Sequence, residues 1–381
     1  MKLADVYITG IGTRLGSRKV TVDQIGERLN ASPRELDRLR RKCGTTVLYR
    51  FDEDESFEDS AVEACRIAMR HAGIELQDVS GIYSSTGGPV TEYLVPDVAR
   101  ILADRMGIAN IDTMGVSMGC VGGLDCVIAA GNRLMVDRHE GKTGHYLIVC
   151  GDHPAMTHRA DDKSTAYLFS DGVACFVLTT QAQDGYRIDR MGSIAAPGDP
   201  MCMKLRSPYL DPAARFEMSG EAVYEFAIKT ALPAILELLQ VGSVPAATYC
   251  VFHQASLSIL RQLAFQAGLA EEDVYFDGIQ QIGNTSGASV MFGLEDALKK
   301  DYIRHGSRVL LGAFGLGLKV GAALLAPVGN PRRIVGHQPD AAALAAAPGP
   351  EGVEVPRKDG SARTPGTALA GATARPGRAG L

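Results

Sequence analysis

The sequence lacks several features that would place it in a specialised class of proteins. It has no tryptophan, and aromatic residues make up only 6% of its 381 residues. Its eight cysteines are scattered without any C-x-x-C pair, which argues against a disulfide framework or a cysteine zinc site. No apolar run approaches the roughly 20 residues that cross a bilayer. The net charge of -5 gives no overall basic surface for nucleic acid. We therefore expect a reduced cytoplasmic protein that binds neither membranes nor nucleic acids.

The remaining composition is that of an ordinary globular enzyme. Hydrophobic residues make up 46% of the chain and charged residues 22%, and the length suits two or three structural units. The first residues, MKLADVYITGIG, alternate as a strand does and do not resemble a signal peptide.

The last segment, residues 329–381, differs from the rest. It contains no Phe, Tyr or Trp and is rich in Ala, Gly, Pro and Arg. Such a segment cannot bury enough apolar surface to offset its ordering entropy, so we predict a disordered tail. Seven basic and four acidic residues give it a net charge of +3, and docking to an acidic partner is the alternative to a solvated tail.

Between the N-terminus and the tail, strand-like runs alternate with helix-like runs. This alternation predicts an α/β fold with a mostly parallel sheet covered on both faces. The sequence Ser56-Phe57-Glu58-Asp59 resembles a capping box, and Pro233 is expected to kink a long helix. The predicted strands are 6–11, 79–84, 146–151, 173–179, 249–252, 308–313 and 319–326. The predicted helical segments are 22–42, 56–73, 96–106, 120–135, 220–240, 256–268 and 287–300.

The two halves of the chain follow the same order of features. Cys120 precedes Cys150 of the next apolar strand by 30 residues, and Asn284 precedes Leu311 of the matching strand by 27. In each half a glycine-rich loop opens a helix, and two apolar strands follow. We interpret this as a duplication, with one half at 1–180, the other at 181–328, and a loop from each meeting at the seam.

Cys120 is the first candidate for chemistry. It lies in MGVSMGCVGGLD, among four glycines and before an apolar run with helical spacing. Glycines allow sharp turns and close approach of a ligand, and a thiol in the first turn of a helix is favoured as thiolate. The alternative is a buried cysteine that acts only as a small hydrophobe.

Two further polar residues stand in apolar or glycine-rich surroundings. His253 ends a short strand in VFHQAS, and Asn284 lies in GNTSGAS. Each alone is more simply a structural histidine or a turn residue. A cysteine nucleophile with histidine and asparagine brought together by the fold is, however, a known catalytic arrangement.

At these residues the sequence resembles the beta-ketoacyl-acyl carrier protein synthase III family, which has the thiolase fold. The resemblance extends over about residues 3–327 and implies two duplicated halves in a five-layer α-β-α-β-α arrangement. The matching motifs are GCVGG around Cys120, GD at 151–152, FSDG at 169–172, HQA at 253–255, GNTSGAS at 283–289 and AFGLG at 313–317.

The resemblance implies an acyltransferase that works in two half-reactions without a cofactor or metal. Cys120 would take an acyl group from a thioester of coenzyme A or acyl carrier protein. His253 and Asn284 would then stabilise the enolate formed by decarboxylation of a malonyl-type thioester. An oxyanion hole would come from backbone N–H groups of Cys120, Gly315 and Leu316. The family also implies a homodimer.

The sequence departs from the family pattern in places that concern its partners. Ser256 and Ser258 stand where the family commonly has Asn and a carrier-docking Arg, and no Trp is available to stack on the adenine of coenzyme A. The stretch Arg38–Lys42 could supply phosphate contacts or be an exposed helix face. These departures indicate a pathway-specific relative, as in secondary metabolism.

Three alternatives to condensation remain open from the sequence. The acyl group could pass from Cys120 to a hydroxyl, an amine or a carrier thiol without condensation. The chain could be a non-catalytic subunit of a larger synthase, although such a subunit would be expected to lose Cys120. A metal site could form in the polar loop that contains His153, His158, Asp161 and Asp162.

Overall fold

A nine-stranded mixed sheet runs through the protein in the order β11-β12-β13-β8-β1-β7-β6-β4-β5. The computed structural model describes residues 5–336, apart from 164 and 207–214, and these form one compact unit. The strands are β1 Tyr7–Leu15, β4 Val79–Thr86, β5 Asp112–Ser117, β6 His145–Asp152, β7 Gly172–Thr179, β8 Gly185–Ala195, β11 Thr248–Phe252, β12 Arg308–Gly315 and β13 Lys319–Val328.

The strand order is the same in the two halves of the chain, as a duplication predicts. In the first half, β1, β4, β6 and β7 lie in the order β4-β6-β7-β1, and in the second half β8, β11, β12 and β13 lie in the order β11-β12-β13-β8. The two series have the same topology, and β5 extends only the first. The halves join where β1 pairs with β8 through residues 7–8 and 186–187. Two α/β halves are thus present as predicted, while the boundary at 180/181 stays a prediction.

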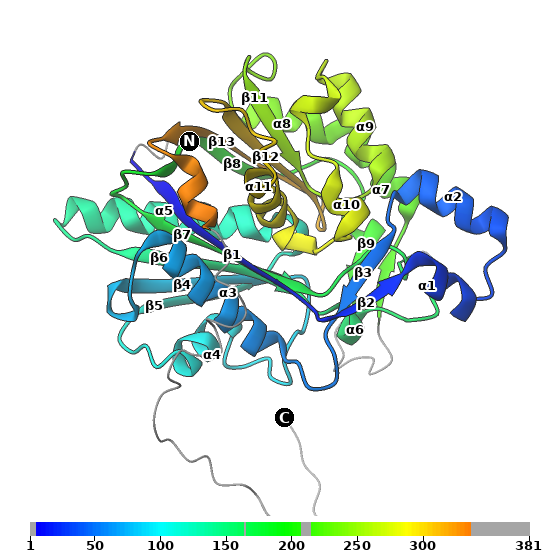
Figure 1. Ribbon diagram of the computed structural model, residues 1–381, viewed down its shortest axis with the longest axis horizontal. Coiled ribbons are helices and arrows are strands. Elements are labelled where there is room, and N and C mark those ends of the chain that lie inside the picture. The colour runs from blue at the N-terminus through cyan, green and yellow to red at the C-terminus, as the bar shows by residue number, and fades with distance from the viewer. Residues whose placement is uncertain (1–4, 164, 207–214, 337–381) are drawn as a thin grey trace, which may run out of the picture. The chain divides into compact units, whose positions relative to one another are not determined.

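Helices cover the outer faces of the two halves and fill the space between them (Figure 1). The central layer contains α5 Gly122–His139 and α11 Ser289–Lys299, whose apolar residues share one core with both halves of the sheet. The outer face of the first half packs on α3 Phe57–Ala72 and α4 Val98–Arg105. The outer face of the second half packs on α8 Leu232–Leu238 and α9 Leu257–Gln266. The layers therefore alternate α-β-α-β-α, as the thiolase-like fold requires.

The prediction of a mostly parallel sheet is wrong for the strand pairs. Three pairs in the large sheet are parallel and five are antiparallel. Within the first half only β7 runs against its neighbours, but it lies between β1 and β6 and so makes two antiparallel pairs. Apolar runs identify buried strands without revealing their direction, because both faces of each strand are covered. Strands β5 and β8 were not predicted.

The predicted helices are present, with local differences. Ser56 caps α3 by accepting the Asp59 N–H, but Asp59 returns its carboxylate to the Ser56 hydroxyl and not to the backbone, so the capping box is incomplete. The kink expected at Pro233 is a π-helical turn, Ala227–Ala231, between α7 Gly220–Phe226 and α8. A proline has no N–H to continue the helical ladder, and the wider turn accommodates that loss.

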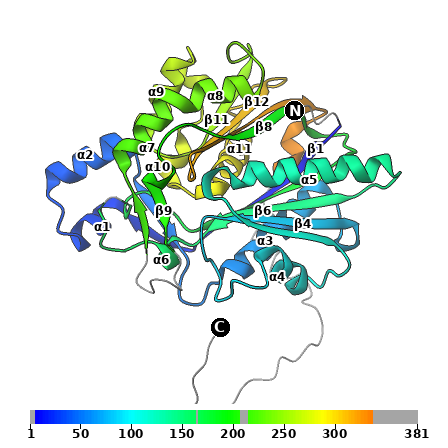
Figure 2. The same cartoon turned by 180° about the vertical axis from the view of Figure 1, so that it is seen from behind.

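A smaller region lies beside the large sheet (Figure 1), and Figure 2 shows its helices from behind. It contains the β2–β3 pair and helices α1 and α2, and near it lie the short α6 and the β9–β10 pair. The bounds are β2 Arg18–Thr21, α1 Val22–Arg28, α2 Pro33–Cys43, β3 Val47–Arg50, α6 Pro154–Thr157, β9 Met203–Leu205, β10 Phe216–Met218 and α10 Asp277–Gln281.

The prediction of a disordered tail from residue 329 is wrong for the first residues of that segment. Residues Pro331–Val335 form a short 3-10 helix, and the side chains of Ile334 and Val335 are buried in the central core. These two apolar residues were overlooked because the composition of the whole segment is dominated by Ala, Gly and Pro. Residues 337–381 lie outside the described residues.

The expectation that no apolar run approaches the length of a membrane span is wrong for one stretch, Gly119–His139, which is long and apolar enough by length and composition alone. It includes α5, which lies in the central layer of the fold. Packing between the two halves of the sheet accounts for its apolar character.

Candidate active site

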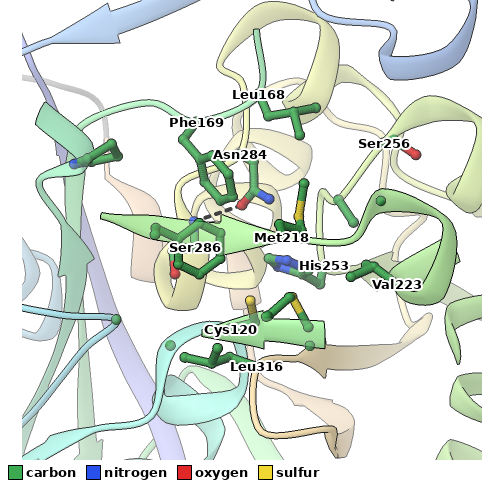
Figure 3. Close-up of a pocket in the computed structure, with 18 of the residues that line it drawn as sticks. Cys120, Leu168, Phe169, Met218, Val223, His253, Ser256, Asn284, Ser286 and Leu316 are labelled. Atoms are coloured by element: carbon green, nitrogen blue, oxygen red, sulfur yellow. Dashed lines mark hydrogen bonds between the residues drawn. The ribbon is translucent and has the colours of Figure 1, made fainter. Parts of the chain in front are cut away.

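Cys120, His253 and Asn284 line one cavity of about 230 Å³. Cys120 lies in a 3-10 turn, Gly119–Val121, directly before α5, His253 follows β11, and Asn284 precedes the turn that opens α11. Figure 3 shows the sulfur of Cys120, the ring of His253 and the amide of Asn284 converging on the same space. The fold thus brings together three residues that lie up to 164 positions apart in the sequence.

The two glycine-rich loops meet at the seam between the halves, as the duplication predicts. A Cβ atom on Gly287 would lie 2.6 Å from the carbonyl oxygen of Gly119. Because that neighbour is rigid backbone, only glycine permits this approach. The contact sets the separation of the loop with Cys120 from the loop with Asn284.

The loop after β12 closes over the sulfur of Cys120. Gly315 has a φ of +154°, and a Cβ there would lie 2.6 Å from the sulfur. The backbone N–H of Leu316 and that of Cys120 itself are directed at the thiol. Leu316 and Cys120 therefore present two backbone donors beside the sulfur, and the lack of a side chain at Gly315 leaves space there.

Burial sets the protonation of the thiol. The position of Cys120 before α5 predicted a thiolate, but desolvation is the largest influence and the pKa of Cys120 is raised above the ordinary value of 9.0. The nearby carboxylate of Asp152 raises it further, against hydrogen bonds from Leu316 N–H and the Ser286 hydroxyl. Cys120 is therefore a neutral thiol at rest.

His253 is held as a neutral imidazole. Its Nδ1 lies 2.6 Å from the Ser289 hydroxyl, and the ring of Phe314 stands edge-on at 5.7 Å. Burial lowers the pKa of His253 to about 4, and no carboxylate opposes the shift. The bond to Ser289 leaves Nε2 as the ring nitrogen available to a ligand.

The amide of Asn284 is oriented by its own loop. Its Oδ1 accepts the Ser286 N–H at 2.8 Å, so the NH₂ group remains available as a donor. The Asn284 backbone pairs with the segment before β7, donating to Leu168 O and accepting from Ser170 N. These bonds fix the amide in the cavity wall.

Sequence reasoning missed several residues of the cavity. Asp152 and Ser286 are buried in its wall; both lie in motifs that the sequence analysis names, GD and GNTSGAS, but neither was given a role. The β9–β10 pair was also not predicted, although Met203 and Leu205 of β9 and Phe216 and Met218 of β10 line the cavity. The apolar lining includes Leu39, Leu168, Phe169, Met203, Leu205, Phe216, Met218, Val223 and Ile259.

The other candidate residues have local roles. Ser256 caps α9 and lies 3.2 Å from Ser258, hydroxyl to hydroxyl. From the Arg38–Lys42 stretch in α2, Lys42 reaches the cavity.

The polar loop that suggested a metal site has its side chains directed at different partners. His153 contacts Phe51, and His158 lies between Phe169 and Phe216. Within residues 5–336, outside the two gaps, no group of three or more His, Cys, Asp or Glu side chains is placed to hold a metal.

Comparisons with known proteins agree with this geometry. The family profile described as 3-Oxoacyl-[acyl-carrier-protein (ACP)] synthase III C terminal matches residues 244–326, which include His253 and Asn284. The beta-ketoacyl-[acyl-carrier-protein] synthase III of Clostridium perfringens is 28% identical over 297 residues, covering 75% of this chain and 89% of the relative. That of Listeria welshimeri is 28% identical over 324 residues, covering 84% and 97%. The chain is therefore similar to ketosynthase III proteins over most of its length, and its C-terminal part matches the family profile.

Solved structures of ketosynthase III proteins and of OleA share the fold of this chain. The 3-oxoacyl-[acyl-carrier-protein] synthase III of Aquifex aeolicus has a TM-score of 0.73 at 23% identity, covering 84% of this chain and 99% of that one. The priming beta-ketosynthase of the R1128 polyketide pathway has a TM-score of 0.74 at 22% identity, covering 86% and 97%. OleA of Xanthomonas campestris, solved with lauric acid and lauroyl-CoA, has a TM-score of 0.73 at 20% identity, covering 84% and 98%. These similarities concern the fold.

Proposed function

We propose that this ketosynthase III-like chain is acylated on Cys120 and then catalyses a decarboxylative Claisen condensation with a malonyl-type thioester. The product is a beta-ketoacyl thioester. The observation that carries the proposal is the convergence of Cys120, His253 and Asn284 on one cavity, with backbone donors at the sulfur.

In the first half-reaction the sulfur of Cys120 attacks the carbonyl carbon of an acyl thioester. The carbonyl oxygen becomes an oxyanion, which the N–H groups of Cys120 and Leu316 stabilise. Expulsion of the donor thiolate then leaves the acyl group on the sulfur. Removal of one such donor typically costs on the order of 10²–10³ in rate.

In the second half-reaction His253 and Asn284 hold the thioester carbonyl of the malonyl-type extender. A neutral His253 donates from Nε2, and Asn284 donates from its amide. Loss of carbon dioxide transfers an electron pair into the enolate, whose developing negative charge these two donors stabilise. The enolate carbon attacks the acyl group, and the sulfur of Cys120 leaves.

The proposed substrates are thioesters of coenzyme A or acyl carrier protein, and no cofactor or metal has a step in this chemistry. Lys42 at the cavity would attract the phosphates of the pantetheine arm, and the apolar wall suits an acyl chain. We further propose a cytoplasmic homodimer, for which light scattering is the direct measurement.

Intact-mass analysis tests the proposal. The purified chain is incubated with a panel of acyl-CoAs, and each productive donor is expected to add one acyl mass. Cys120→Ala should abolish the adduct, and an adduct that survives this substitution would refute the nucleophile. Addition of malonyl-CoA or malonyl carrier protein should then discharge the acyl enzyme and release carbon dioxide.

Acyl transfer without condensation is the second candidate, because the cavity contains a carboxyl group, Asp152, that could activate a hydroxyl or amine acceptor. The same experiment separates the two candidates. Discharge of the acyl enzyme by an acceptor without carbon dioxide release would favour simple transfer. A non-catalytic subunit is disfavoured by the retained Cys120, His253 and Asn284.

A further inference from the structure

Asp152 is a buried acid in the wall of the candidate active site. It is the last residue of β6, it is only 7% exposed, and it lines the same cavity as Cys120. Its Oδ1 accepts the backbone N–H of Gly87 at 2.6 Å. That single backbone bond leaves the second carboxylate oxygen for another partner.

The Ser286 hydroxyl stands between this acid and the nucleophile. Ser286 lines the same cavity as Asp152 and Cys120, and its side chain interacts with both groups, lowering the pKa of each. The backbone of Ser286 is fixed at a φ of +52° by the bond from its N–H to Asn284 Oδ1. A hydroxyl can accept one proton while donating another, so Ser286 connects the two groups as a proton carrier.

We propose that Asp152, acting through the Ser286 hydroxyl, is the base that takes the proton of Cys120 when the enzyme is acylated. This inference rests on the proposed function, since it concerns acylation of Cys120 by a thioester.

The step balances without another reactant. The Cys120 S–H proton passes to Ser286 Oγ as the Ser286 O–H proton passes to Asp152, and the sulfur's electron pair forms the bond to the acyl carbon. When the tetrahedral adduct collapses, the carbon–sulfur bond to the donor breaks. The departing thiolate then recovers the proton from Asp152 through the same hydroxyl.

Electrostatics favours Asp152 over His253 as the base. Transfer of the Cys120 proton to the carboxylate only moves one negative charge from Asp152 to the sulfur. Transfer of the proton to His253 would instead create two opposite charges in a buried site. Burial lowers the pKa of His253 to about 4 and raises that of Asp152 to about 6, so the carboxylate is the stronger base. The other ionisable groups that interact with Asp152 are Asp171, which raises its pKa, and Cys150.

The test compares two reactions of Cys120 in the wild type and Asp152→Asn. Alkylation by iodoacetamide reports the thiolate, and single-turnover acylation by the best acyl-CoA donor reports proton transfer. The amide of D152N can still accept the Gly87 N–H but cannot take a proton. In D152N we expect the pH midpoint of Cys120 alkylation to fall, because a negative charge near the thiol is removed. We expect acylation of D152N to be at least tenfold slower than that of the wild type. The fall in the wild-type acylation rate below about pH 6 should be absent from D152N.

The outcomes separate this role from a structural one. If D152N slowed alkylation and acylation equally, the substitution would have damaged the cavity and the proposal would be overturned. An unchanged acylation rate and pH profile in D152N would overturn it as well. Ser286→Ala is the second variant, with acylation at least tenfold slower although the carboxylate is intact. Thr285→Val is the matched control, because this neighbouring hydroxyl is buried without a hydrogen-bond partner in the described chain. A wild type that no acyl-CoA acylates on Cys120 would instead refute the proposed function itself.

Discussion

Cys120, Asp152 and His253 are ionisable groups that line one cavity, and burial moves each toward its neutral form. It raises the pKa of the thiol and of the carboxyl, and it lowers that of the imidazole. The local sequence predicts Cys120 as the candidate nucleophile, while the protonation of its thiol depends on the surrounding protein.

His158 allows the effect of burial on a pKa to be tested through the pH dependence of the unfolding free energy. Its pKa is lowered from 6.5 to about 4 by desolvation, between the rings of Phe169 and Phe216. As pH falls below 6.5 the unfolded chain binds the proton first, so this group's stabilisation is complete above 6.5 and is lost toward pH 4. Relative to His158→Phe, the wild type should lose about 1.4 kcal/mol of unfolding free energy per pH unit in that window.

Urea unfolding of both proteins at pH 7.5, 6.0 and 5.0 measures this difference. Other titrating groups, including Asp152, are common to the two proteins and cancel. Parallel pH dependences for wild type and H158F would contradict the assigned shift.

Gly315 tests the space around the nucleophile. Gly315→Ala would place a Cβ 2.6 Å from the Cys120 sulfur at a φ of +154°, so acylation should fall at least tenfold. Gly317→Ala is the matched control, because its φ of +87° is also strained but its Cβ would contact nothing within 4 Å. Single-turnover acylation is the measurement, and equal losses in both variants would show that loop strain alone is responsible.

At the scale of elements, the site depends on what packs behind it. Helix α3 covers the outer face of the first half and contacts both β1 and β7. The loop before β7 holds Asn284 through the Leu168 and Ser170 backbone bonds. Helix α3 therefore supports the strands on which the candidate site is built, although it contributes no residue to the cavity.

Ser56→Ala tests the start of that helix. The substitution removes the side-chain oxygen that accepts the Asp59 N–H, and it should cost about 1 kcal/mol of unfolding free energy. Ser60→Ala, one turn further along the same helix, is the control and should change stability by less than about 0.5 kcal/mol. Denaturant unfolding measures both, and similar losses would contradict a capping role.

At the scale of the whole molecule, the two halves share the central layer of helices α5 and α11. The cavity lies at the meeting of the two glycine-rich loops and takes residues from both halves. Neither half by itself contains Cys120 together with His253 and Asn284. The short 3-10 helix at Pro331–Val335 completes this shared core from the C-terminal side.

Two truncations test where the folded unit ends. A chain that ends at Gly336 retains the buried side chains of Ile334 and Val335, which are 1% and 4% exposed, and should unfold as the full chain does. A chain that ends at Val328 loses both, at a cost of about 3 kcal/mol or more. Calorimetry or urea unfolding distinguishes them, and equal stability of the two truncated chains would place the end of the core at Val328.

The amino-acid pattern by itself determined the α/β class and the duplication, and it singled out Cys120, His253 and Asn284 as candidate site residues. Apolar runs and glycine-rich loops are local features, so they can be recognised without the fold. Strand direction was beyond the pattern, since β7 is apolar on both faces whichever way it runs. Asp152 and Ser286 were also beyond it, because their proximity to Cys120 arises only when the end of β6 and the Asn284 loop meet. The tertiary structure alone decided which groups surround the thiol, and through desolvation it decided which of them carries charge.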